Sequence, residues 1–108
     1  CSTCNDWYTR RMVGTAPLGS LSTVQATLMD RQFHRLGRRL DPPTKPQSIV
    51  VHCGFCLHCD TSDVILELEV LNERHRRRIV RTVHAPHSAL DDILASQALS
   101  SSKMGAAL

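Results

Sequence analysis

Aromatic residues are scarce in this chain, and their scarcity limits the core that it can build. Trp7, Tyr8, Phe33 and Phe55 are the full set, 4% of 108 residues. A chain of this length is enough for one domain and too short for two. Because a small domain buries a modest share of its surface, a metal ion or disulfides often complete its stability. We therefore expect this domain to be stabilised by a metal ion or by disulfides.

Long apolar runs and a signal peptide are also missing. No stretch of about eighteen apolar residues occurs, so we predict no membrane partner. No basic, apolar and small-residue signal precedes Cys1. Residue 1 is Cys and not Met. We therefore expect that a targeting segment has been removed, that the chain belongs to a longer parent protein, or that it is an excised fragment. A reducing intracellular compartment is the expected location, either the mitochondrial matrix or the cytoplasm and nucleus.

Lysine is in short supply as well, because eleven of the thirteen basic residues are arginine. The formal net charge is +3. Arginine presents a planar fork that suits phosphate. We predict nucleic-acid contacts at the clustered residues Arg35, Arg38, Arg39, Arg74, Arg76, Arg77 and Arg78. A solvated basic face is the plainer interpretation of the same clusters.

The five cysteines, by contrast, fall in two short segments. Cys1 and Cys4 form one Cys-x-x-Cys step, and Cys53 and Cys56 form another. Two such steps far apart in a sequence can supply four thiolates to one tetrahedral zinc ion. Gly54 suits the tight turn that such a knuckle needs. We therefore predict a structural zinc site at Cys1, Cys4, Cys53 and Cys56.

The second half of this site has alternatives. Cys56 and Cys59 form an overlapping step, and His52 or His58 can replace a cysteine. Buried cysteines without a metal, disulfides and a redox Cys-x-x-Cys are the other interpretations. An odd number of cysteines argues against disulfides. A redox Cys-x-x-Cys usually lies at the start of a helix, and no helical pattern follows this motif.

The hydrophobic pattern predicts an α+β fold, a small zinc-ribbon-like domain with a short antiparallel sheet. Val64, Leu66, Leu68 and Val70 share one strand face, and a hairpin over 64–71 and 78–84 follows. Further strands are expected at 7–13 and 48–52. Across the hairpin, Arg78 or Arg81 is expected to face Glu67 or Glu69.

Two helices complete the expected fold. Apolar spacing predicts one helix over 22–36, with a capping box from Ser22 to Gln25 and a stop at Gly37. A second helix is expected over 88–99. The domain would then cover residues 1–97, and residues 98–108 would form an extended tail.

Two function classes fit these features. The first is a non-enzymatic, zinc-stabilised RNA-binding subunit of a ribonucleoprotein such as a ribosome or mitoribosome, in contact with RNA and other subunits. The second is a zinc-binding protein-interaction module, for example a viral regulatory protein or suppressor of host defence. Neither takes a small-molecule substrate, and no catalytic residue is predicted, since deaminase and metalloprotease signatures are missing. If the arginines form one continuous face, RNA is favoured; if they scatter or pair with acids, protein is favoured.

Overall fold

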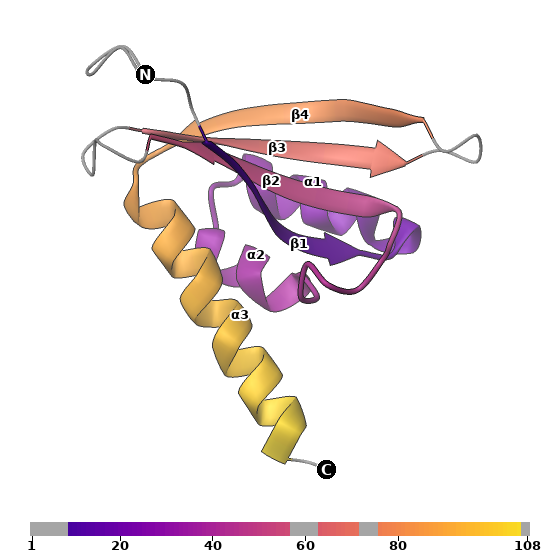
Figure 1. Cartoon of the computed structure of the whole chain (residues 1–108), viewed down its shortest axis with the longest axis vertical. Helices are drawn as coiled ribbons and strands as arrows, with labels where there is room; N and C mark the ends of the chain where they lie inside the picture. Colours follow the sequence, from indigo (N-terminus) through magenta and orange to yellow (C-terminus); the bar gives the residue numbers. More distant parts are fainter. Residues whose placement is uncertain (1–8, 57–62, 72–75, 107–108) are drawn as a thin grey trace.

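The computed structural model describes residues 9–56, 63–71 and 76–106, with residues 98–106 described by their backbone alone. In this part of the chain, a four-stranded antiparallel sheet carries its helices on one face (Figure 1). The elements are β1 (Thr9–Ala16), the 3-10 helix η1 (Leu18–Ser20), α1 (Leu21–Met29), α2 (Phe33–Arg39), β2 (Ile49–Phe55), β3 (Val64–Leu71), β4 (Arg77–Ala85) and α3 (Ser88–Ala106). The α+β class is confirmed.

The strands lie in the sheet in their chain order, β1-β2-β3-β4, and each pairs antiparallel with the next. The predicted hairpin is confirmed, with β4 one residue longer at each end. The expected strands 7–13 and 48–52 are observed as β1 and β2, and both extend further along the chain. Residues 7 and 8 lie outside the described residues.

Strand residues alternate between a face that the helices cover and an open face. Val64, Leu66 and Leu68 of β3 are fully buried on the helix-side face, as their spacing predicted. Leu36 of α2 and Ile93 of α3 pack into the same core. Burial of such large aliphatic side chains, at about 25 cal/mol per Å² of apolar surface, is the main stabilising term for this sheet.

The single helix predicted over 22–36 is wrong, because the chain turns after Met29 and begins α2 at Phe33. Arg31 has a φ of 57°, in the left-handed region. The amide of Arg31 donates to Leu28 O, and that of Gln32 donates to Thr27 O. This pair of hydrogen bonds is a Schellman ending, which usually uses glycine at the left-handed position. The apolar spacing continues across the break, so periodicity alone did not reveal it.

The expected start and stop of that helix are also different. α1 begins at Leu21, and its N-cap residue is Ser20 rather than Ser22, without a capping hydrogen bond from the Ser20 side chain. The Ser20 hydroxyl donates instead to Pro17 O at 2.8 Å. Gly37 lies inside α2 and does not end it.

Gly37 is needed where α2 meets α3. A Cβ atom at this position would collide with the carbonyl oxygen of Ile93 and would approach Ser96 Cβ to 2.9 Å. The Ser96 hydroxyl, which is fully buried, donates to the carbonyl oxygen of His34 in α2. The backbones of α2 and α3 are therefore in direct contact at Gly37, and the hydrogen bond from Ser96 to His34 fixes the register of the two helices.

α3 starts at Ser88 as expected and continues to Ala106, beyond the predicted end at residue 99. Residues 98–106 are therefore helical and not an extended tail. Along this helix, Gln97 reaches β1: its amide nitrogen donates to Val13 O at 3.2 Å and to Asp41 O at 3.0 Å. The β1–β2 register shifts between Met12 and Gly14. Gln97 thus supplies a donor to a carbonyl at this irregularity, where ladder pairing is interrupted.

We predict that Gly37→Ala lowers the free energy of unfolding by at least about 2 kcal/mol, because the added methyl group must push α3 away from α2. Gly19→Ala is the matched control, since no atom lies within 4 Å of a Cβ built there. Urea denaturation of both variants measures the difference. Equal stability of the two variants would contradict the close packing at Gly37.

Candidate functional site

The structure places Cys53 in the hydrophobic core and not in a turn. Cys53 lies within β2, where it pairs with Arg11 and Leu66, and its side chain is fully buried among the core residues. Gly54 is also a strand residue, so the turn expected there is wrong. Burial raises the pKa of the Cys53 thiol to about 11. Because zinc binds the thiolate, this position disfavours Cys53 as a ligand.

Cys56 is placed differently, just after the end of β2, and it is buried. Thr9 at the start of β1 pairs with Phe55 at the end of β2. The chain therefore enters β1 and leaves β2 at the same end of the sheet. Cys1 and Cys4 precede that end in the sequence, and Cys59 follows it. These three cysteines and His58 lie outside the described residues.

Among the residues that are described, no group of three or more His, Cys, Asp or Glu side chains is placed to hold a metal ion. The zinc site and the zinc-ribbon part of the fold therefore stay predictions. His52, an alternative ligand, belongs to the open face, whereas Cys53 next to it belongs to the helix-side face.

The predicted arginine contacts fall in two different layers. Arg35, Arg38 and Arg39 are exposed on α2, within the helical layer (Figure 1). A second group, Arg76, Arg77 and Arg78, lies at the hairpin end of β4 and is also exposed. Arg74 lies outside the described residues. The two groups lie on different elements, and Arg77 of the second group is on the open face, where Glu69 pairs with it, so they do not form one strip of unmatched cations.

The open face of the sheet holds a cluster of paired charges centred on Glu69. Arg10 Nη2 lies 3.1 Å from Glu69 Oε2 and 3.5 Å from Glu67 Oε2. Arg77 Nε lies 3.5 Å from Glu69 Oε1. Arg78 and Arg81, which were expected to face these acids, lie opposite Val70 and Leu68 instead, on the helix-side face. The register shift after Leu68 places Arg77, rather than Arg78, opposite Leu71. The Glu69 side chain is only 7% exposed, so its charge needs these partners.

His52 completes this cluster from β2. Its Nε2 atom lies 3.4 Å from Glu69 Oε2 but without hydrogen-bond geometry. Burial is the main cause that lowers the pKa of His52, and Arg10 lowers it further, while Glu69 and Glu67 oppose the change. The neutral imidazole is therefore favoured in the folded chain. Sequence reasoning missed the burial of His52 and Glu69; two glutamates two residues apart in an apolar strand were the available signal.

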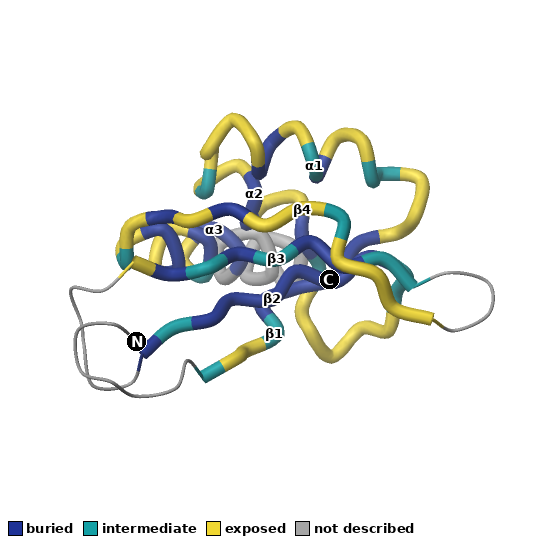
Figure 2. The backbone as a smooth tube through the Cα atoms, turned by 90° about the horizontal axis from the view of Figure 1, so that it is seen from above, coloured by how far each residue is buried: buried dark blue, intermediate teal, exposed yellow. Residues whose placement is uncertain are grey.

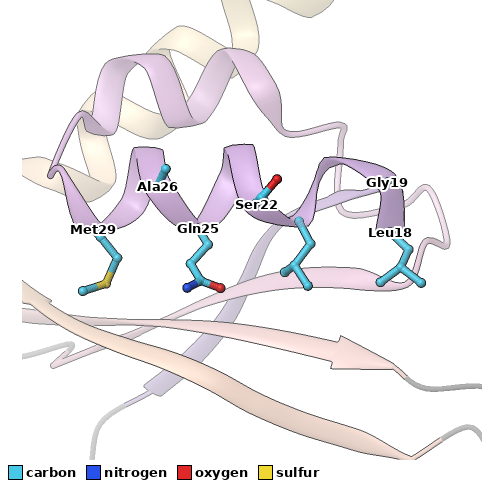
Figure 3. A pocket seen from close by; sticks show the side chains of 7 residues that line it. Leu18, Gly19, Ser22, Gln25, Ala26 and Met29 are labelled. Atoms are coloured by element: carbon cyan, nitrogen blue, oxygen red, sulfur yellow. The ribbon is translucent and has the colours of Figure 1, made fainter.

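A stripe of side chains along η1 and α1 lines a hollow of about 460 Å³, whose lining residues all come from these two helices. We call Leu18, Leu21, Gln25 and Met29 the α1 stripe. Leu18 is 54% and Met29 is 51% exposed, which is high for large apolar residues. In Figure 3 the side chains of Leu18, Gln25 and Met29 point from the helix toward the side where the strands lie.

A second hollow, of about 500 Å³, lies on the open face. The segment from Pro43 to Ser48 forms one wall, and Met12, Val50, Leu71 and Arg77 contribute to the others. Its two cations are already paired, Lys45 with Asp41 at 3.5 Å and Arg77 with Glu69. This hollow therefore offers no unmatched charge to a ligand.

Comparisons of the chain with family models, with curated proteins and with solved structures found no match. Within the described ranges, no helix combines the length and the apolar character needed to cross a membrane. The function must therefore be argued from the geometry of this chain alone.

We predict that acidification destabilises the chain in part through His52. The folded chain binds a proton at His52 less readily than the unfolded chain, whose pKa is near 6.5, so the free energy of unfolding falls as the pH drops below that value. His52→Gln should remove this part, so that its free energy of unfolding falls less than that of the wild type between about pH 7.5 and 5.5. The exposed His84→Gln variant is the control. Identical pH profiles for wild type and His52→Gln would contradict the prediction.

Proposed function

We propose that this chain is a non-enzymatic, zinc-stabilised module that binds another protein, and that the partner presents acidic side chains. The distribution of the arginines is the observation that supports this. Arg10 and Arg77 are matched by Glu67 and Glu69 on the open face. The arginines of α2 lie in the other layer. A nucleic-acid backbone needs a continuous strip of unmatched cations, and the described residues do not offer one.

Exposed apolar side chains near arginine also favour a protein partner. Leu18, Met29 and Ile79 are each about half exposed. Arg78 and Arg81 are exposed on β4, the strand against which α1 packs. Protein interfaces combine apolar side chains with arginine in this way.

An RNA-binding subunit of a ribonucleoprotein, such as a ribosome or mitoribosome, is the second candidate. It is favoured by one observation: Arg76, Arg77 and Arg78 are consecutive and exposed at the hairpin end of β4. An arginine cluster at the end of a hairpin can lie against a phosphate backbone and release counterions.

Binding to RNA and to an acidic peptide separates the two functions. We expect a single-stranded uridine oligonucleotide to bind at physiological salt no more tightly than the nonspecific range of about 10⁻⁴ to 10⁻⁶ M. A glutamate-rich peptide with apolar residues and the same net charge should bind at least tenfold more tightly. Fluorescence anisotropy measures both. RNA binding below 1 μM that weakens when Arg74, Arg76, Arg77 and Arg78 are all replaced by alanine would overturn the proposal in favour of RNA.

We further propose that zinc is held by Cys1, Cys4 and Cys56, with Cys59 in preference to Cys53 as the fourth ligand. The core position of Cys53 and the placement of Cys56 at the sheet end where β1 begins support this choice. A closed site of four thiolates would have a structural role, since catalytic zinc keeps one position open. Such a site also requires a reducing compartment, which is where we place the chain.

Two serine variants test this ligand set. Cys56→Ser should lose zinc and unfold, because metal binding is linked to folding. Cys53→Ser should keep one zinc per chain and lose about 1–3 kcal/mol of stability, because it buries an unpaired hydroxyl in the core. Zinc content and thermal unfolding under reducing conditions measure both effects. Loss of zinc from Cys53→Ser would restore Cys53 as a ligand, and a folded wild-type chain without zinc would refute the site.

A further inference from the structure

The outer edge of β4 is open in the described part of the chain. β4 pairs only with β3, whereas the outer edge of β1 is partly occupied by a bridge between Thr15 and Asp41. An unpaired strand edge presents a row of backbone donors and acceptors that another strand can pair with. Exposed side chains follow this edge: Arg77, Arg78, Ile79, Arg81, Thr82 and His84. The open edge is therefore long enough to accept a partner strand.

The α1 stripe lies beneath the position that such a strand would take. α1 packs against β4, and Figure 2 shows α1 beyond β4 on the side away from β3. A strand added to β4 would lie about 4.8 Å further out, over α1. Its side chains on the helix-side face would then contact Leu18, Leu21 and Met29. The hollow along this stripe is the space that they would fill.

Unmatched positive charge lies on the same side of β4 as the stripe. Arg81 pairs with Leu68 and Arg78 with Val70, so both belong to the helix-side face of the sheet. Among the described residues neither has a carboxylate partner, and Arg81 Nη1 donates to the carbonyl oxygen of Val80 at 3.3 Å. On the open face, by contrast, Arg77 is paired with Glu69. The unmatched cations thus border the apolar stripe.

From these three observations we infer that an extended acidic segment of another polypeptide binds as a fifth strand along β4. Its backbone pairs with the β4 edge, its apolar side chains rest on the α1 stripe, and its carboxylates pair with Arg78 and Arg81. This inference rests on the proposed protein-binding function and names the surface and the partner's chemistry. Strand addition of this kind obtains affinity from backbone hydrogen bonds and specificity from alternate side chains.

Charge and composition exclude two other occupants of this edge. A second copy of the chain, paired antiparallel through β4, would bring the Arg78 and Arg81 side chains of the two copies together, and like charges across a strand pair are destabilising. Single-stranded RNA would match the arginines but not Leu18 and Met29, and no aromatic residue lies on the stripe for base stacking.

The test uses a labelled peptide of about ten residues in which every second residue, on one face of the strand, is either glutamate or leucine, and the residues between them are threonine. We expect it to bind the wild-type chain, and we expect the double variant Arg78→Glu with Arg81→Glu to weaken binding at least tenfold. Met29→Glu should also weaken it at least tenfold, by placing a charge beneath the strand. Arg35→Glu with Arg39→Glu changes the net charge of the chain by the same amount on α2 and should alter affinity less than twofold. Circular dichroism confirms that each variant is folded.

The outcomes separate this inference from the function on which it rests. Binding that falls equally in the β4 and α2 double variants would refute the β4 site and leave the protein-binding function standing on another surface. The same peptide with alternate backbone amides methylated cannot pair with an edge, so undiminished binding would refute strand addition. RNA binding that requires Arg78 and Arg81, without peptide binding, would overturn both.

Discussion

The close approach of α2 to α3 at Gly37 is the constraint on which the arrangement of the helical layer depends. With no Cβ at this position, the two helices meet at backbone distance, and Ser96 fixes them with a hydrogen bond to His34. α3 thereby crosses the sheet from the end of β4 to β1, where Gln97 holds the irregular part of the strand. α1 is left at the opposite edge of the sheet, against β4 (Figure 2). The exposed α1 stripe is a consequence of that placement.

Charge is divided between the two faces of the sheet in a way that the net charge of +3 does not reveal. On the open face, the carboxylates of Glu67 and Glu69 neutralise Arg10 and Arg77, which lie on the two outer strands. On the helix-side face, Arg78 and Arg81 have no acid opposite them. The one-residue register shift after Leu68 contributes to this difference, because it places Arg77 rather than Arg78 on the face of the glutamates.

Much of the sheet could be predicted from the sequence, because alternation in β3 is a local pattern. The β3–β4 hairpin needs only the two apolar runs and the polar turn between them. The break between α1 and α2 could not be predicted in this way. Arg31 takes a left-handed conformation that arginine rarely adopts, and the apolar spacing continues through it. Gly37 was predicted to end a helix for a related reason. Its observed role, the close contact with Ile93 and Ser96, depends on residues that lie far away in the sequence.

The candidate site was less predictable than the fold. The arginines were recognised as functional candidates, but their partners come from strands that are distant in the chain, as with Arg10 and Glu69. The cysteine spacing indicates a zinc site without distinguishing Cys53 from Cys59. That distinction depends on how far β2 extends, and the strand runs through Cys53 into Phe55. Spacing indicates ligand chemistry, whereas the place of each cysteine in the sheet decides which thiols can meet at one ion: Cys53 lies within β2, and Cys56 follows its end.

The measurement that tests the central claim most directly is amide hydrogen exchange along the sheet, with and without a bound acidic peptide. Edge amides of β4 that point away from β3 should exchange quickly in the free chain and become protected in the complex, while amides of β1 and α2 stay unchanged. That result would place the partner strand on β4. Unchanged exchange along β4 in a chain saturated with peptide, or protection confined to α2, would contradict the account.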